Sequence, residues 1–62
     1  MNTIEMIKEA KKKGITVNMI SNITNINART IYNYCSGNRN ISRDKEKKIR
    51  ETIDRLTDLY KE

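Results

Sequence analysis

This chain of 62 residues contains only two glycines and no proline. This scarcity of residues that break helices and strands constrains the fold more than any other feature. A sheet of short strands needs many tight turns, and such turns depend on glycine and proline. Long stretches without either residue favour helices instead. A chain of this size buries only about 60% of the surface that its unfolded form exposes. We therefore expect one all-α domain over residues 1–62, without an enclosed catalytic pocket.

The residue types that perform catalysis or bind metals are scarce. The chain has no histidine and one cysteine, Cys35, so it can form neither an internal disulfide nor a zinc site. It also has no paired carboxylates, no glycine-rich phosphate loop and no Ser/His/Asp set. We expect no enzymatic activity, no metal and no cofactor, and we interpret Cys35 as a small core residue.

Apolar residues are dispersed along the chain rather than gathered in runs. The first residues lack the apolar run of a signal peptide, and no segment approaches the roughly 18 apolar residues of a membrane span. We therefore expect no membrane association and a cytoplasmic location.

The charges are distributed unevenly. The net charge is +5, and no acidic residue occurs between Glu9 and Asp44. The cations of this acid-free segment are Lys11, Lys12, Lys13, Arg29, Arg39 and Arg43. A surface without acids does not repel phosphate, so it can approach a polyanion. The alternative is that these cations are ordinary solvated side chains.

Capping residues predict two helices in the first part of the chain. Asn2, with an acid three residues later, predicts the start of a helix over about 3–13, and Gly14 predicts its end. Thr16 predicts the start of a second, shorter helix over about 17–24.

The stretch Asn25-Ile26-Asn27 predicts a tight joint between the second helix and a third. Asparagine tolerates the left-handed conformation that ends a helix, so Asn25 can stop the second one. Asn27 can cap a third helix over about 28–36, while Ile26 packs against Ile31 as a hydrophobic staple.

The third helix has two different faces. Ile31, Tyr34 and Cys35 recur at helical spacing and are expected to face the core. The outward face consists of Ala28, Arg29, Tyr32, Asn33 and Ser36.

A long fourth helix is predicted from the cap Ser42 to the C-terminus. Its apolar residues Ile49, Ile53, Leu56 and Tyr60 follow a 4-3-4 spacing that is typical of a coiled-coil seam. Two interpretations are open. Ile53, Leu56 and Tyr60 form a homodimer interface, or the same face fills the core of the single chain.

The predicted second and third helices, with the joint between them, can be compared with a known sequence pattern. Residues 16–37 read T-V-N-M-I-S-N-I-T-N-I-N-A-R-T-I-Y-N-Y-C-S-G. Residues 16–41 resemble the lambda-repressor and Cro family of phage and bacterial regulators, also called the XRE family, whose pattern is roughly T-Q-x-x-L-A-x-x-x-G-V-S-x-x-x-I-x-x-x-E-x-G. The spacings agree without a gap. The matching positions are Ser21, Asn25, Ile26, Ile31 and Gly37.

The chain departs from this family pattern at several positions. Val17 stands where the family often has a phosphate-binding glutamine, and Cys35 replaces a frequent glutamate. Thr24 replaces an aliphatic residue and is expected to weaken the packing of the second helix, with Ile23 compensating. Most members of the family also have five helices, whereas four are predicted here.

The resemblance implies sequence-specific binding of double-stranded DNA, with the third helix in the major groove. Arginine reads guanine and asparagine reads adenine, and Arg29 and Asn33 lie one turn apart on the outward face. We therefore predict a small transcriptional regulator, a repressor of phage, plasmid or bacterial origin. The predicted base contacts are Ala28, Arg29, Tyr32 and Asn33. The predicted contacts to the DNA backbone are Thr16, Asn18, Asn27, Asn38, Arg39, Asn40 and Arg43.

The sequence is also compatible with other interpretations. The chain could be a small protein-binding module that uses the same scaffold to inhibit or modulate a partner protein. It could also bind nucleoid DNA or RNA without specificity. At the level of single residues, Arg29 could be an ordinary solvated side chain, Asn27 only a cap, and Tyr32 a cover for the edge of the core.

Overall fold

The computed structural model describes residues 2–60, except for the side chain of Tyr60. These residues form four α-helices joined by short connections, and they contain no strand. The helices are α1 (Thr3–Lys12), α2 (Val17–Thr24), α3 (Ala28–Cys35) and α4 (Arg43–Tyr60). The all-α class with four helices and a long C-terminal helix is therefore confirmed. The start and end of each short helix agree with the sequence prediction to within one residue.

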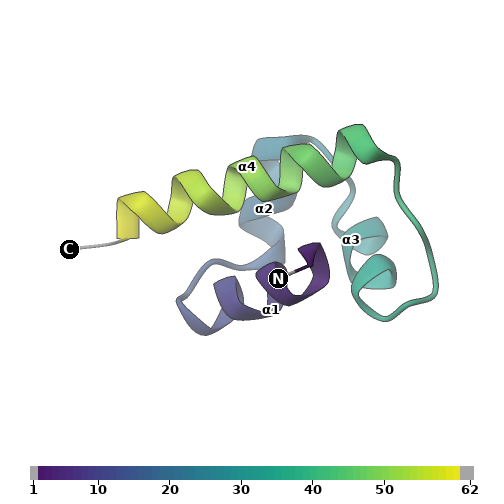
Figure 1. Cartoon of the computed structure of the whole chain (residues 1–62), viewed down its shortest axis with the longest axis horizontal. Coiled ribbons are helices and arrows are strands. Elements are labelled where there is room, and N and C mark those ends of the chain that lie inside the picture. Colours follow the sequence, from purple (N-terminus) through teal and green to yellow (C-terminus); the bar gives the residue numbers. More distant parts are fainter. Residues whose placement is uncertain (1, 61–62) are drawn as a thin grey trace.

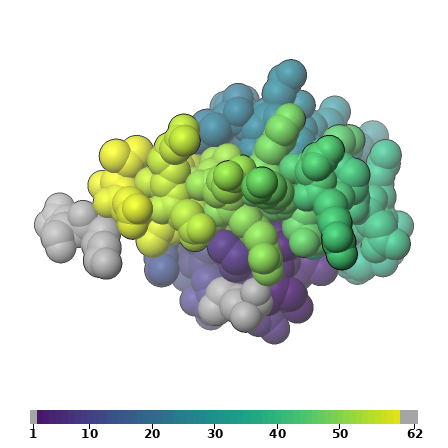
Figure 2. Space-filling view, turned by 45° about the horizontal axis from the view of Figure 1, so that its top comes forward, coloured from purple at the N-terminus to yellow at the C-terminus, as the bar shows by residue number. Residues whose placement is uncertain are grey.

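The long helix α4 organises the molecule. It runs across the whole domain and packs against α1 on one side and α2 on the other (Figure 1). α3 packs mainly against α2 and lies near the N-terminal end of α4. The space-filling view shows the surface of α4 as a band between the surfaces of α2 and α1 (Figure 2). This arrangement leaves one side of α3 exposed.

α1 begins and ends as its sequence predicts. The side-chain oxygen of Asn2 accepts a hydrogen bond from the backbone N–H of Glu5 at 2.8 Å, which caps the helix. Gly14 ends it with a φ of 94°, a conformation that a residue with a Cβ adopts only under strain. The N–H of Ile15 then returns to the carbonyl of Ala10 at 2.9 Å, which turns the Ile15 side chain into the core.

Aliphatic side chains from every helix form one core. Ile20, Ile31 and Ile49 lie at its centre and are fully enclosed, so α2, α3 and α4 meet through isoleucine. The burial of each such side chain stabilises the fold by about 1.5–3 kcal/mol. The buried apolar set is Ile7, Ala10, Ile15, Val17, Ile20, Ile26, Ile31, Ile49, Ile53 and Leu56.

The predicted dimer face of α4 is divided between core and surface. Ile53 and Leu56 are buried in the core of the single chain, so the core-filling interpretation holds for these two side chains. The third member, Tyr60, has its side chain outside the described residues. Leu59, in contrast, is 74% exposed. A homodimer stays a prediction, and any interface on α4 would have to use side chains that the core leaves free.

No described helix combines the length and the apolar character that a bilayer span requires.

Candidate nucleic-acid interface

A three-residue turn joins α2 to α3, and its course depends on asparagine. Asn25 has φ 63° and ψ 23°, and it is the only residue other than glycine with a positive φ among those the structure describes. Its N–H donates to the carbonyl of Ser21 at 2.8 Å, which closes the last turn of α2. Asparagine adopts this left-handed conformation more readily than other residues with a side chain, so the predicted stop is confirmed.

The start of α3 is held by a cap and by the core. The side-chain oxygen of Asn27 accepts a hydrogen bond from the backbone N–H of Arg29 at 2.8 Å. Ile26 and Ile31, the two members of the predicted staple, are both buried in the same core. The cap fixes where the helix begins, and the buried pair fixes how it leans on α2.

Thr24 braces the turn from the end of α2. Its hydroxyl is buried, donates to the carbonyl of Ile20 at 2.7 Å and accepts from the N–H of Ile26 at 3.3 Å. The expectation that Ile23 would compensate for this threonine in the core is wrong, because Ile23 is 51% exposed. The threonine is itself buried, and its hydroxyl satisfies two backbone groups.

The outer face of α3 carries most of the predicted base contacts. Arg29 is exposed and Tyr32 is 52% exposed, whereas Asn33 is half-buried. Ala28 differs from the sequence expectation, because it is half-buried and packs against the core beside the turn. Its predicted base contact stays a prediction, with only part of the methyl group available.

A glycine in the left-handed conformation follows the end of α3, and a polar loop begins after it. Gly37 has a φ of 82°, and the N–H of Asn38 bonds back to the carbonyl of Asn33 at 3.0 Å. The loop then leads to Ser42, whose hydroxyl accepts from the N–H of Lys45 at 3.3 Å and caps α4. The exposed polar residues at this end of α3 are Asn38, Arg39, Asn40 and Arg43.

The helix starts differ in charge. The first turns of α1 and α4 contain acids, namely Glu5 in α1 and Asp44 and Glu46 in α4, which stabilise the positive ends of their helix dipoles. The first turns of α2 and α3 contain none and rely on the neutral caps Thr16 and Asn27. No acid in their own first turns compensates the positive dipole ends of α2 and α3.

The cap of α2 also uses a side chain that the family pattern does not predict. The hydroxyl of Thr16 accepts from the N–H of Met19 at 3.2 Å, and the Met19 sulfur accepts from the N–H of Thr16 at 3.5 Å. The thioether takes the place that a glutamate or glutamine has in a usual capping box. This end of α2 is thus closed without a charge.

The structure places the predicted backbone contacts in two groups on the surface. Thr16, Asn18 and Asn27 lie at the starts of α2 and α3, and the others follow the end of α3. All of these side chains are exposed. Along the chain, the two groups flank the outer face of α3.

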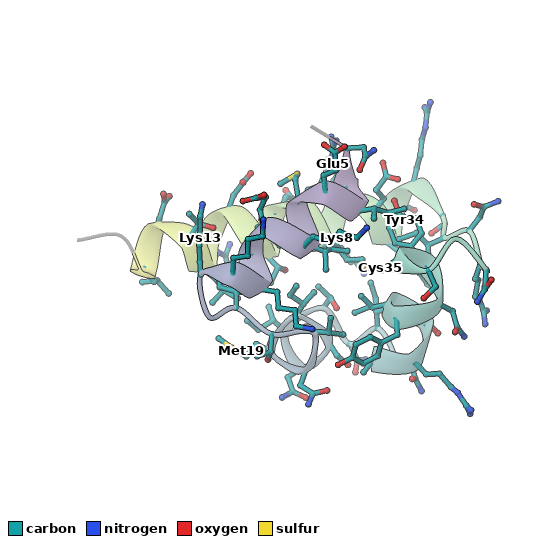
Figure 3. The ribbon with its side chains drawn as sticks, turned by 90° about the horizontal axis from the view of Figure 1, so that it is seen from below. Glu5, Lys8, Lys13, Met19, Tyr34 and Cys35 are labelled. Carbon is teal, nitrogen blue, oxygen red and sulfur yellow. The ribbon has the colours of Figure 1, made fainter. Side chains whose placement is uncertain are left out.

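A polar cluster on the inner side of α3 was not predicted from the sequence. The hydroxyl of Tyr34 donates to Oε2 of Glu46 on α4 at 3.1 Å. Beside it, Nε of Arg50 on α4 donates to the hydroxyl of Thr3 on α1 at 2.8 Å. Figure 3 shows Tyr34 where α3 approaches α1 and α4. Sequence spacing identified Tyr34 as inward-facing but gave no signal for its partner twelve residues away.

This cluster alters the acidity of the tyrosine. Burial raises the pKa of the Tyr34 hydroxyl, and its hydrogen bond to Glu46 raises the pKa further, while a hydrogen bond with Thr3 lowers it in part. The hydroxyl therefore keeps its proton and acts as a donor at neutral pH.

Cys35 lies next to this cluster and packs against the core. Burial raises the pKa of its thiol, and the nearby positive charge of Lys8 lowers it in part (Figure 3). A raised thiol pKa disfavours the reactive thiolate. Cys35 is half-buried and packs at the edge of the core, which agrees in part with its prediction as a small core residue. Within the described part of the chain, no group of three potential metal ligands lies together.

Comparisons of this chain with protein-family models, with curated proteins and with solved structures found no match.

Proposed function

We propose that this protein binds double-stranded DNA in a sequence-specific manner and acts as a small transcriptional repressor by occupying an operator. One observation carries the proposal. Arg29 is exposed at the second position of α3, in a capped helix–turn–helix unit whose surface contains no acid.

The outer face of α3 offers the chemistry of base recognition. The helix has 8 residues and is thus about 12 Å long, a length that fits into a major groove. Arg29 can bind the two acceptors of a guanine, and Asn33, one turn later, can bind an adenine. Tyr32 is also exposed on this face and can contact a thymine methyl group or a sugar. One arginine and one asparagine on such a face supply sequence discrimination rather than bulk affinity.

The surroundings of α3 suit the phosphate backbone. The starts of α2 and α3 present backbone N–H groups and neutral polar side chains without a competing carboxylate. Arg39 and Arg43 lie beyond the other end of α3 and can bind phosphate as point charges. Contacts of this kind position a protein on DNA without specifying its sequence.

A homodimer would give this small reader enough contacts for a specific site. Two copies on half-sites about 34 Å apart would place both α3 helices on one side of the duplex. The exposed Leu59 near the end of α4 is the apolar side chain that supports this part of the proposal. Such a regulator would act in the cytoplasm of a bacterium.

A second candidate function is binding of a protein partner. The exposed Ile23 lies beside Lys48, Glu51 and Arg55 in a shallow groove between α2 and α4. An apolar side chain surrounded by polar and charged ones matches the apolar centre and polar rim of a protein interface. This groove favours the alternative that the scaffold inhibits or modulates another protein.

Selection of bound duplexes from a random pool tests the proposed function. We expect enrichment of a two-fold symmetric sequence, and we expect the enriched duplex to bind more tightly than a scrambled one at moderate salt. Binding to all duplexes alike, with a steep salt dependence, would indicate non-specific binding. Failure to bind any duplex at low salt would contradict DNA binding and favour the protein partner.

A further inference from the structure

The short helix α3 depends on other elements for its orientation. It packs mainly against α2 and to a lesser extent against α1. Its centre is held by the buried side chain of Ile31. Close packing of aliphatic side chains resists separation of the helices and large rotations. Hydrogen bonds are directional and further restrict small rotations of a helix about its own axis.

Hydrogen bonds to α4 provide such directional contacts. Tyr34 of α3 donates to Glu46 at 3.1 Å, and Arg50, one turn further along α4, donates to Thr3 of α1 at 2.8 Å. Glu46 and Arg50 are four residues apart on α4, so the two bonds start from the same face of that helix. The four side chains therefore connect α1, α3 and α4 in one network.

Three of the four side chains are shielded from water. Thr3 is only 1% exposed, and Tyr34 and Glu46 are half-buried, whereas Arg50 is exposed. Hydrogen bonds are stronger where water is excluded, and a partner left unpaired there is costly. The Tyr34–Glu46 bond is therefore expected to persist rather than exchange freely with solvent.

We propose that Tyr34, held by Glu46, is a positioning residue that sets the rotation of α3 and thereby the aim of Arg29 and Asn33 at base edges. This inference rests on the proposed function. Tyr34 and Arg29 are five residues apart, which places them about 140° apart around the helix. The guanidinium of Arg29 can extend roughly 10 Å from the helix axis, so a rotation of α3 by about 20° would move it by about 3.5 Å, more than a bidentate base contact tolerates.

The first test does not involve DNA. Tyr34→Phe keeps the ring in place and removes only the hydroxyl. We expect amide hydrogen exchange in α3 to accelerate about threefold to tenfold beyond any change in α2, because the helix loses its tie to α4. Gly14→Ala is the control, since it strains the end of α1 at a φ of 94° without touching the network. Equal acceleration in α2 and α3 of Tyr34→Phe would overturn the inference.

The second test measures discrimination, defined as the ratio of affinities for a selected duplex and a scrambled duplex. Tyr34→Phe is expected to lower this ratio about threefold to tenfold and to leave affinity for the scrambled duplex unchanged. Glu46→Ala should behave in the same way, whereas Glu46→Gln keeps an acceptor oxygen and should retain most of the ratio. Gly14→Ala should retain it fully.

A double-mutant cycle separates positioning from general destabilisation. In an Arg29→Ala background, Tyr34→Phe should lower discrimination by much less, because the side chain that it aims is absent. Equal losses of discrimination in both backgrounds would overturn the inference about Tyr34 but not the proposed function. The same holds if Tyr34→Phe leaves the ratio unchanged while the wild type discriminates. A wild-type protein that binds both duplexes equally would overturn the proposed function, and with it the role of Tyr34 in specificity.

Discussion

Asn27 and Arg29 are joined by a hydrogen bond of 2.8 Å between the side-chain oxygen of the first and the backbone N–H of the second. The cap of α3 thus bonds directly to the residue that we propose to read DNA. A neutral amide performs this task here, although a carboxylate would cap the helix equally well. The choice of asparagine keeps the start of α3 free of negative charge.

Substitutions of Asn27 separate capping from charge. Asn27→Asp keeps the acceptor and interacts well with the helix dipole, so we expect the free energy of unfolding to stay within about 0.5 kcal/mol of the wild type. The same change places a negative charge next to DNA phosphate, and affinity should fall about tenfold for every duplex. Asn27→Ala should instead lower the free energy of unfolding by about 1 kcal/mol. Urea unfolding of both variants measures the free energies, and DNA titration measures the affinities. If Asn27→Asp binds DNA like the wild type, the start of α3 does not lie next to phosphate.

Thr24→Val tests the brace of the α2–α3 turn. Valine keeps the shape of threonine but leaves the N–H of Ile26 without its acceptor at 3.3 Å. We expect the free energy of unfolding to fall by about 1 kcal/mol, although valine is the more apolar residue. Ile23→Thr is the matched control on the exposed side of α2, with an expected change within about 0.5 kcal/mol. A stabilised Thr24→Val variant would show that the hydroxyl has no bracing role.

Local signals in the sequence were sufficient for the helices and their caps. Asn2, Thr16, Asn27 and Ser42 each precede a helix and cap it, because capping depends on residues at most three positions apart. The left-handed Asn25 was predictable for the same reason.

Contacts between distant helices were beyond local signals. The 4-3-4 spacing of α4 described a core face and a dimer face equally well, and only the packing of α1 and α2 showed that Ile53 and Leu56 belong to the core. The pairing of Tyr34 with Glu46 likewise depends on how α3 crosses α4, which no spacing within either helix specifies. The candidate site followed the same division. Exposure of Arg29 was predictable from periodicity, while the partial burial of Ala28 and Asn33 was not.

Substitutions on α4 distinguish a dimer interface from the core. Ile53→Asp buries a charge in the core and should lower the free energy of unfolding by more than about 3 kcal/mol. Leu59→Asp lies on the surface and should change it by less than about 0.5 kcal/mol. By sedimentation at tens of micromolar, we expect a dimeric wild type and a more dissociated Leu59→Asp variant. A wild type that stays monomeric, even on DNA, would contradict the homodimer.

Alkaline pH should destabilise the fold in two steps. Burial raises the pKa of Cys35 above its usual 9.0 and that of Tyr34 above its usual 10.0, so the folded chain keeps protons that the unfolded chain releases. The contribution of these two groups to the free energy of unfolding is therefore complete below about pH 9. It is lost as pH rises above 9 for Cys35 and above 10 for Tyr34. Urea unfolding at pH 7.5, 9.5 and 10.5 measures this loss. Cys35→Ala should remove the first step and Tyr34→Phe should reduce the second, and identical profiles in all three proteins would contradict the assignment.

The central claim is that α3 reads DNA sequence through Arg29, and one comparison of two arginine variants tests it most directly. The affinities of the wild type, Arg29→Ala and Arg39→Ala are measured for the selected and the scrambled duplex at two salt concentrations. We expect Arg29→Ala to lose about 1–3 kcal/mol per half-site on the selected duplex alone, and its preference at one base pair should relax. Arg39→Ala should weaken binding to both duplexes alike and reduce the salt slope by about one. Equal weakening of both duplexes by Arg29→Ala would make Arg29 a phosphate contact or a bystander and would contradict the claim that α3 reads the bases.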